Sequence, residues 1–326
     1  MSLDLVLSNL LTPPILFFAL GMLATFVRSD LEIPPGMKKG LALYLLFSIG
    51  MRGGAELSST SLSSATWVPL LAGVAASALL PCASFAFLRR RLAVSDAAAI
   101  AATYGSISAV TFATACAFLD DRHIGWSGSM VATMALMESP AILVATLLAR
   151  RNGVVAPTRS DGHARGVLAE SFSSGPVIVL LGSFVIGALA GRKGFASVEA
   201  FTHAPFKGVL CLFLLDMGMV AARGLGDLRR HGRMLLAFAI LVPLAHAGLA
   251  LGIARITGMS AGDALLLTVL MASASYIAVP AAMRMLLPES NPGIHLPMAL
   301  AVTFPFNIAL GLPLYLGVIE ACWPGR

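Results

Sequence analysis

The feature that most constrains this chain is the alternation of long apolar stretches with short charged loops. Hydrophobic residues make up 58% of the 326 positions and charged residues 12%, and the mean hydropathy is +0.87. Because about 20 apolar residues in a helix cross the hydrocarbon core of a bilayer, this pattern predicts an all-α integral membrane protein. We expect ten transmembrane helices, near residues 12–27, 38–55, 66–88, 96–119, 126–149, 173–191, 203–222, 234–256, 262–287 and 295–319.

The basic residues predict how the chain is oriented in the membrane. Of the 22 Lys and Arg, 15 fall on one side of the ten spans and seven on the other. Because short cytoplasmic loops carry the excess of Lys and Arg, we expect both termini outside the cytoplasm. Residues 1–11 contain no Lys or Arg, which favours a retained first span over a signal peptide. The net charge of +6 is explained by these loops, and we expect no nucleic-acid partner.

One long polar stretch, residues 150–172, divides the ten spans into five and five. We expect it to be a cytoplasmic linker between a first repeat at 1–149 and a second repeat at 173–326. An odd number of spans in each repeat gives the repeats opposite orientations, an arrangement found in many secondary transporters. Short matches support two inverted five-helix repeats: Lys39-Gly40-Leu41 with Lys207-Gly208-Val209, Ser48–Met51 with Asp216–Met219, Asp96-Ala97 with Asp263-Ala264, and Glu138-Ser139-Pro140 with Thr303-Phe304-Pro305.

Two spans are interrupted by small hydroxyl residues at the same internal position. Ser106 and Ser108 in the first repeat precede Ser273 and Ser275 in the second by 167 residues. Such breaks are tolerated in a membrane only inside protein or beside a cavity. Half-helix N-termini favour an anion, whereas freed carbonyls and hydroxyl oxygens favour a small cation. The breaks predict a site for an anion moving with a cation, while hydroxyls bonding their own helix carbonyls or close helix packing would explain the same pattern.

Ionisable residues inside the spans are further candidates, because a charge in a membrane is costly. Glu138 lies just before Pro140 in the middle of its span, where it suits a sodium ligand, a gate or a structural role. Asp216 lies deep in its span, where a structural ion pair with Arg52 or Arg223 is at least as well supported as a functional role.

Other polar residues have ordinary structural explanations beside functional ones. Asp96 and Asp263 stand at predicted helix starts, where N-capping is the usual role. Asn307 follows Pro305 in the last span, and its amide suits either an ion ligand or a supporting hydrogen bond. His246 lies well inside a span, and we expect it to be a packed residue rather than a proton carrier.

No catalytic or nucleotide-binding pattern accompanies these residues. The sequence contains no H-E-x-x-H or Walker A motif. Its four cysteines form no C-x-x-C pair, so neither a zinc site nor a disulfide is expected. We therefore expect neither an enzyme nor an ATP-driven pump, and no cofactor other than a coupling ion.

Several segments together resemble the sodium-dependent bicarbonate transporter family known from cyanobacteria. The similarity covers nearly the whole chain and is most specific in the second repeat. It is carried by the segments Gly105–Ser108, Glu138–Ala141, Ala272–Arg284, Pro288–Pro292 and Val302–Asn307.

This resemblance implies a core domain that moves against a gate domain, sodium-driven bicarbonate uptake across a bacterial inner membrane, a homotrimer, and regulation by a small cytoplasmic protein of the PII class. It implies substrate binding at the two breaks, on Gly105, Ser106, Ser108, Thr111, Ser273, Ala274 and Ser275. It places sodium among Ser108, Glu138, Ser275, Thr303 and Asn307.

The chain departs from the family pattern at two places. Where the cyanobacterial pattern has Ser-Gly-Ser-Thr after the first break, this chain has Ser108-Ala109-Val110-Thr111. In the turn where Asp is expected it has Glu138. A glycine and a hydroxyl are therefore replaced, which leaves open a sodium-coupled symporter of another small carboxylate or organic anion. A membrane enzyme, a receptor or a scaffold is a more distant alternative.

Overall fold

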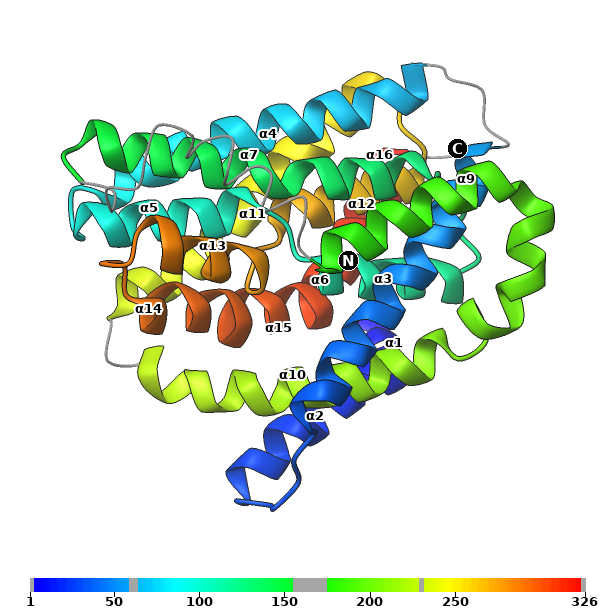
Figure 1. Ribbon diagram of the computed structural model, residues 1–326, viewed down its shortest axis with the longest axis horizontal. Coiled ribbons are helices and arrows are strands. Elements are labelled where there is room, and N and C mark those ends of the chain that lie inside the picture. The colour runs from blue at the N-terminus through cyan, green and yellow to red at the C-terminus, as the bar shows by residue number, and fades with distance from the viewer. Residues whose placement is uncertain (1–2, 59–63, 155–174, 229–231, 324–326) are drawn as a thin grey trace.

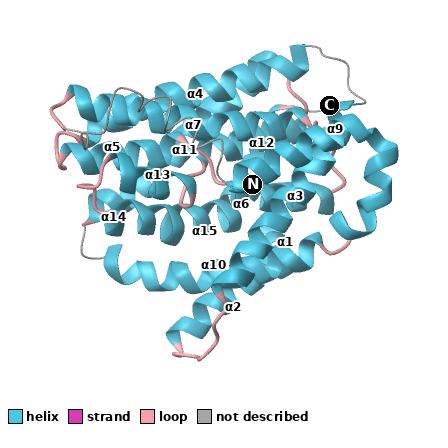
Figure 2. Cartoon of the chain, in the orientation of Figure 1, coloured by secondary structure: helices cyan, strands magenta, loops and turns pink. Residues whose placement is uncertain are grey.

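The computed structural model describes residues 3–58, 64–154, 175–228 and 232–323. Within these ranges the chain is folded into helices with short connections, and none of the described residues is in a strand (Figure 1, Figure 2). Most of the expected linker, residues 155–172, lies outside the described ranges. The predicted first repeat contains α1 (Leu3–Leu10), α2 (Pro13–Phe26), α3 (Pro35–Ser58), α4 (Ser64–Leu88), α5 (Val94–Gly105), α6 (Ala109–Asp121) and α7 (Ser129–Arg151). The predicted second repeat contains α9 (Gly175–Thr202), α10 (Phe206–Leu228), α11 (Arg233–Thr257), α12 (Ala261–Ala272), α13 (Ala278–Leu286) and a last stretch from α14 (Pro292–Pro297) to α16 (Leu312–Cys322).

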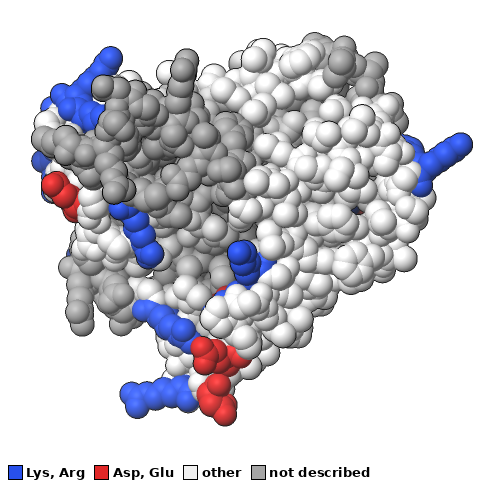
Figure 3. Space-filling model, in the orientation of Figure 1, with Lys and Arg blue, Asp and Glu red and all other residues white. Residues whose placement is uncertain are grey.

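The helices are those of a multi-pass membrane protein. In the described part of the chain, seven stretches are long and apolar enough to cross a membrane, by length and composition. Each of the ten predicted spans coincides with a helix, a pair of half-helices or, at the end, a chain of short helical segments. Among the others, α2 and α12 are apolar but shorter, and α3 carries Lys38, Lys39 and Arg52. A broad part of the face drawn in Figure 3 consists of uncharged residues.

Two predicted spans are interrupted, as the hydroxyl patterns indicated. The first is α5 followed by α6, and the segment between them includes Ser106 and Ser108 in extended conformation. The second is α12 followed by α13, separated by residues 273–277. Both breaks lie in the middle of the molecule, with α4 and α7 along one edge and α10 along the opposite edge (Figure 1).

Glycines allow two pairs of helices to approach closely, α2 with α10 and α3 with α9. A Cβ at Gly21 would overlap the Leu215 carbonyl oxygen, and a Cβ at Gly218 would overlap that of Phe18. In the other pair, a Cβ at Gly54 would overlap the Phe184 carbonyl oxygen. Small residues at such contacts are a common basis of helix association in membranes, where apolar burial between helices contributes little.

The last span is less regular than predicted. Between α14 and α16 the backbone contains two π-helical segments, η2 (Met298–Thr303) and η3 (Asn307–Gly311), separated by the single turn α15 (Phe304–Phe306). Pro305 lies in that turn and has no backbone N–H to donate. Local π-helical widening is frequent at functional sites, and here it includes Thr303 and Asn307.

The prediction that Asp96 and Asp263 cap their own helices is wrong. The side chain of Ser260 caps α12, no side chain caps α5, and both aspartates lie at the third position of their helices, within the first turn. Asp96 Oδ1 instead accepts the N–H of Asn291 at 2.7 Å, just before α14. Asp263 Oδ1 accepts the N–H of Ser127 at 2.7 Å, just before α7. Each carboxylate therefore holds the start of the fifth span of the other predicted repeat.

Asp216 forms an ion pair, but not with either predicted partner. Its Oδ1 atom lies 2.6 Å from Lys38 Nζ, so the pair joins α10 to the start of α3. Arg52 is instead paired with Asp120 at the end of α6. Sequence could identify Asp216 as a buried carboxylate but not the flexible Lys side chain that reaches it from another helix.

Candidate substrate and ion site

The two helix breaks cross and hydrogen-bond directly to each other. The Ser108 N–H donates to Ser273 Oγ at 2.9 Å. The Ser275 N–H donates to the Thr103 carbonyl oxygen at 2.9 Å. Backbone groups that a continuous helix would satisfy internally are therefore satisfied by the opposite break, which explains how both interruptions persist in an apolar interior.

The first hydroxyl of each break braces the backbone. Ser273 Oγ accepts from Ser108 and also donates to the Leu270 carbonyl oxygen at 2.8 Å. Ser106 Oγ donates to the Glu138 carbonyl oxygen of α7 at 3.1 Å. Both serines are buried. These two predicted substrate residues thus support the site by fixing its backbone.

The second hydroxyl of each break accepts an N–H group from the first turn of the half-helix that follows. Ser108 Oγ accepts the Thr111 N–H at 3.2 Å at the start of α6. Ser275 Oγ accepts the Val279 N–H at 3.3 Å at the start of α13. The other N–H groups of a first turn have no partner within their helix, and the helix dipole makes that end positive.

Both half-helix N-termini lie beside one cavity of about 70 Å³. A water molecule takes up about 30 Å³ in the liquid, so this is room for a small solute. The cavity is bounded on one side by the breaks and α7, and on the other by α3 and α9. Its lining comprises Ala42, Leu46, Ile107, Ser108, Ala109, Met134, Glu138, Pro176, Val177, Leu180, Ser275, Tyr276, Ile277 and Ala278.

Among the residues that line the cavity, Glu138 is the one with a carboxylate side chain. It lies on α7, which the Ser106 hydroxyl holds against the first break. No hydrogen bond or ion pair within the described residues engages its carboxylate. A carboxylate beside two serine hydroxyls offers the oxygen ligands that a hard cation prefers.

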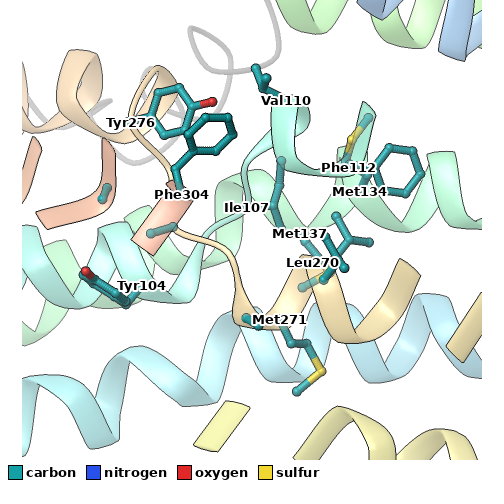
Figure 4. Close-up of a cluster of buried hydrophobic side chains, with 14 of the residues drawn as sticks. Tyr104, Ile107, Val110, Phe112, Met134, Met137, Leu270, Met271, Tyr276 and Phe304 are labelled. Atoms are coloured by element: carbon teal, nitrogen blue, oxygen red, sulfur yellow. The ribbon is translucent and has the colours of Figure 1, made fainter. Parts of the chain in front are cut away.

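Aromatic side chains close the site on the side of the second break. Tyr276 and Phe304 pack edge to face, with ring centroids 5.6 Å apart, near the point where the two breaks cross (Figure 4). The Tyr276 ring lines the cavity and is buried. Its place next to Ser275 was visible in the sequence, but its orientation depends on packing against the last span.

Thr303 and Asn307 lie outside the cavity lining and support the breaks from the last span. Thr303 Oγ1 lies 2.8 Å from the Tyr104 hydroxyl and donates to the Ala239 carbonyl oxygen at 2.7 Å. Asn307 Nδ2 donates to the Ala272 carbonyl oxygen at 2.9 Å, at the end of α12. The Asn307 amide oxygen accepts from Tyr315 at 2.9 Å.

The predicted site residues therefore form a lining and a supporting layer. Ser108, Ser275 and Glu138 line the cavity. Gly105, Ser106, Thr111, Ser273 and Ala274 are buried outside the lining. Sequence reasoning missed the apolar contribution from α3 and α9, namely Ala42, Leu46, Pro176, Val177 and Leu180. Nothing marks these residues in the sequence, because an apolar residue facing a cavity looks the same as one facing lipid.

These features define a class of protein. Paired broken helices that present their N-termini to a small buried cavity, in a multi-pass helical membrane protein, are the arrangement of secondary transporters. Residues 13–320 match the family model of the Na+-dependent bicarbonate transporter superfamily, and the chain belongs to that superfamily. It is a membrane transporter and not an enzyme. No curated protein sequence matches the chain significantly.

Proposed function

We propose that this protein carries bicarbonate together with sodium into a bacterial cell across its inner membrane. The observation that carries the proposal is the meeting of two half-helix N-termini at a cavity lined by Ser108, Ser275 and Glu138. Membership of the superfamily supports the choice of substrate and coupling ion.

The anion is held by the positive ends of α6 and α13. Their first-turn N–H groups and the serine hydroxyls can donate hydrogen bonds to the oxygen atoms of bicarbonate. The bonds that Ser108 and Ser275 accept from first-turn N–H groups fix the half-helices in position. The site is therefore organised before the anion arrives, which lowers the ordering cost of binding.

Sodium offsets the charge of both bicarbonate and the Glu138 carboxylate. An anion next to an ionised Glu138 would be repelled, because like charges interact strongly in a dry interior. A sodium ion between Glu138 and the hydroxyls of Ser108 and Ser275 removes that repulsion. Thr303 and Asn307 belong to the proposed ion site as residues that hold the ends of α5 and α12. Each ion thus binds better when the other is present, which is the basis of coupling.

Two inverted five-helix repeats, with a moving core and a stationary gate, complete the proposal. The packing partners support it, since α2 on α10 and α3 on α9 are the same contact seen from the two repeats. The bonds from Asp96 to Asn291 and from Asp263 to Ser127 are related in the same way. The breaks, with α7 and the last span, form the core. Helices α2, α3, α9 and α10 form the gate.

Orientation and assembly follow from the charge pattern and the family resemblance. Both termini lie outside the cytoplasm, and the linker 150–172 lies inside. The resemblance further supports a homotrimer and a PII-like cytoplasmic regulator as partners.

A second substrate class is favoured by one observation. Apart from the serines, Tyr276 and Glu138, the lining is apolar, with Leu46, Ile107 and Met134 among its residues. An anion with a small apolar part, such as a short carboxylate, would match that lining better than bicarbonate does. Sodium-coupled transport of such a carboxylate is therefore the alternative.

The test is uptake of labelled bicarbonate into proteoliposomes with an imposed inward sodium gradient, and a potassium gradient as the ionic control. Wild type is compared with Ser108→Ala and Ser275→Ala. Thr114→Val is the matched variant, because Thr114 lies on α6, is buried outside the cavity and bonds only its own helix, at the Val110 carbonyl.

Sodium-dependent uptake that falls in both serine variants and persists in Thr114→Val supports the proposal. Uptake that ignores sodium overturns the coupling. If bicarbonate is not taken up and a short carboxylate competes for a measurable sodium flux, the short carboxylate replaces bicarbonate as the proposed substrate.

A further inference from the structure

A second and larger cavity, of about 720 Å³, lies at the far end of α6 from the first break. Its walls come from α3, the end of α6 with the following loop, the end of α9 and the start of α10. The proposed function assigns α6 to the core and the other three helices to the gate. The cavity therefore lies between two bodies that must move relative to each other.

Two ion pairs connect the end of α6 to the gate helices at this cavity. Arg52 of α3 donates to both carboxylate oxygens of Asp120, with Nη2 2.8 Å from Oδ1. Its guanidinium carbon lies 4.6 Å from the centroid of the Trp126 ring, whose N–H points to the same carboxylate. One residue further along, Asp121 is paired with Lys207 of α10.

We propose that the pairs Arg52–Asp120 and Lys207–Asp121 form a gate that holds the core against α3 and α10 at this mouth and must open in each transport cycle. The inference rests on the proposed function, because it needs a core that moves.

The geometry of the Arg52 pair suits such a gate. A bidentate arginine pair stacked on an aromatic ring has directional contacts that a shift of α6 along α3 would break together. Both side chains retain contact with solvent, with 28% and 23% of their surfaces exposed. The separated charges can therefore be rehydrated, unlike those of a fully buried pair.

The opposite end of the molecule carries a counterpart of the second pair. In the repeat alignment Lys39 corresponds to Lys207, and Glu289 follows α13 as Asp121 ends α6. Both Lys39 and Glu289 are exposed, and the described structure contains no ion pair between them. In an inverted-repeat transporter the two ends exchange roles, so Lys39 and Glu289 approach when the gate at Asp120 and Asp121 opens.

A natural probe lies in the cavity wall. Cys116 is on α6 one turn before Asp120, is buried, and lines the larger cavity. We would measure the rate at which a membrane-impermeant maleimide labels Cys116 in nanodiscs, with Cys82, Cys211 and Cys322 replaced by Ser. Opening of the gate increases that rate, and the measurement requires no substrate and no transport.

The gate variants are Arg52→Gln and, as a second route to the same loss, Asp120→Asn. Arg122→Gln is the matched control, because Arg122 also lies at the end of α6 but stacks on Phe118 of its own helix. We expect about fivefold faster labelling in both gate variants, which corresponds to about 1 kcal/mol. The control is expected to label at the wild-type rate, and Arg52→Asp combined with Asp120→Arg is expected to return toward it.

Unchanged labelling in both gate variants, or an equal increase in Arg122→Gln, would overturn the gate. The alternation is tested by disulfide formation between Lys39→Cys and Glu289→Cys, which we expect to increase when Asp120→Asn is added. A yield that does not respond overturns the alternation. If bicarbonate uptake fails while labelling behaves as expected, the substrate assignment is wrong and the gate stands.

Discussion

The two helix breaks occupy matching positions in the chain but differ in length and in the hydrogen bonds that hold them. The first consists of three residues, begins after Gly105, and leads into the 13-residue helix α6. The second consists of residues 273–277, begins after Ala272, and leads into the nine-residue helix α13. The hydroxyl of Ser273 accepts the Ser108 N–H of the first break and donates to the Leu270 carbonyl oxygen of α12, whereas the hydroxyl of Ser106 bonds only to α7. The two serine pairs therefore occupy matching positions in the sequence but form different hydrogen bonds.

The largest effect should come from removing the hydroxyl that joins the breaks. Ser273→Ala leaves the buried N–H of Ser108 without its acceptor, at a cost of about 1–3 kcal/mol. If this cost falls on the loaded state, sodium-driven uptake in proteoliposomes drops by about 5- to 150-fold. Ser106→Ala should lose less uptake, because the Glu138 carbonyl oxygen, which loses the serine hydroxyl as a donor, can still accept a hydrogen bond from another group. Equal losses in the two variants would contradict the asymmetry.

The next effect concerns the residues that end the half-helices. A Cβ at Gly105 would overlap the Pro81 ring of α4, so Gly105→Ala should destabilise the protein by about 1–3 kcal/mol through overpacking. Its counterpart Ala272 already carries a methyl group in a buried position. Ala272→Gly should therefore cost only about 1 kcal/mol, the usual penalty of glycine in a helix. Thermal unfolding of both variants in detergent measures the difference in stability. A smaller loss of stability for Gly105→Ala than for Ala272→Gly would show that the Pro81 ring moves to make room for the methyl group.

A third expected effect distinguishes the residues of the fifth span in each predicted repeat that face the breaks, Glu138 and Thr303. The first break faces Glu138, and the corresponding position behind the second is Thr303, which is bonded to Tyr104 and Ala239. Glu138→Gln keeps the shape but removes the charge that we propose offsets sodium. We expect the sodium concentration for half-maximal uptake to rise about tenfold, a change of about 1.4 kcal/mol, with less change in maximal rate. Uptake with unaltered sodium dependence would remove Glu138 from the ion site.

Sequence predicted the parts of this molecule that depend on local pattern. The apolar periods gave the ten helical stretches, and the hydroxyl pairs gave the positions of both breaks. It failed where a side chain reaches another helix, as when Asp96 and Asp263 bond across to Asn291 and Ser127 instead of capping their own helices. The π-helical segments of the last span were also missed, since they result from packing around Pro305 and carry no distinct periodicity.

The smallest predicted difference is between the two caps. Ser108 bonds the N–H three residues on, which is the usual N-cap arrangement, while Ser275 bonds the N–H four residues on at 3.3 Å. Ser108→Ala should therefore cost about 1 kcal/mol of stability and Ser275→Ala about 0.5 kcal/mol, within the range for lost caps. Thermal unfolding without substrate measures this structural part, and uptake measures the additional loss of a hydroxyl from the cavity. If both variants unfold like wild type but lose uptake equally, the hydroxyls act on the transported ions and the caps contribute little to holding the half-helices.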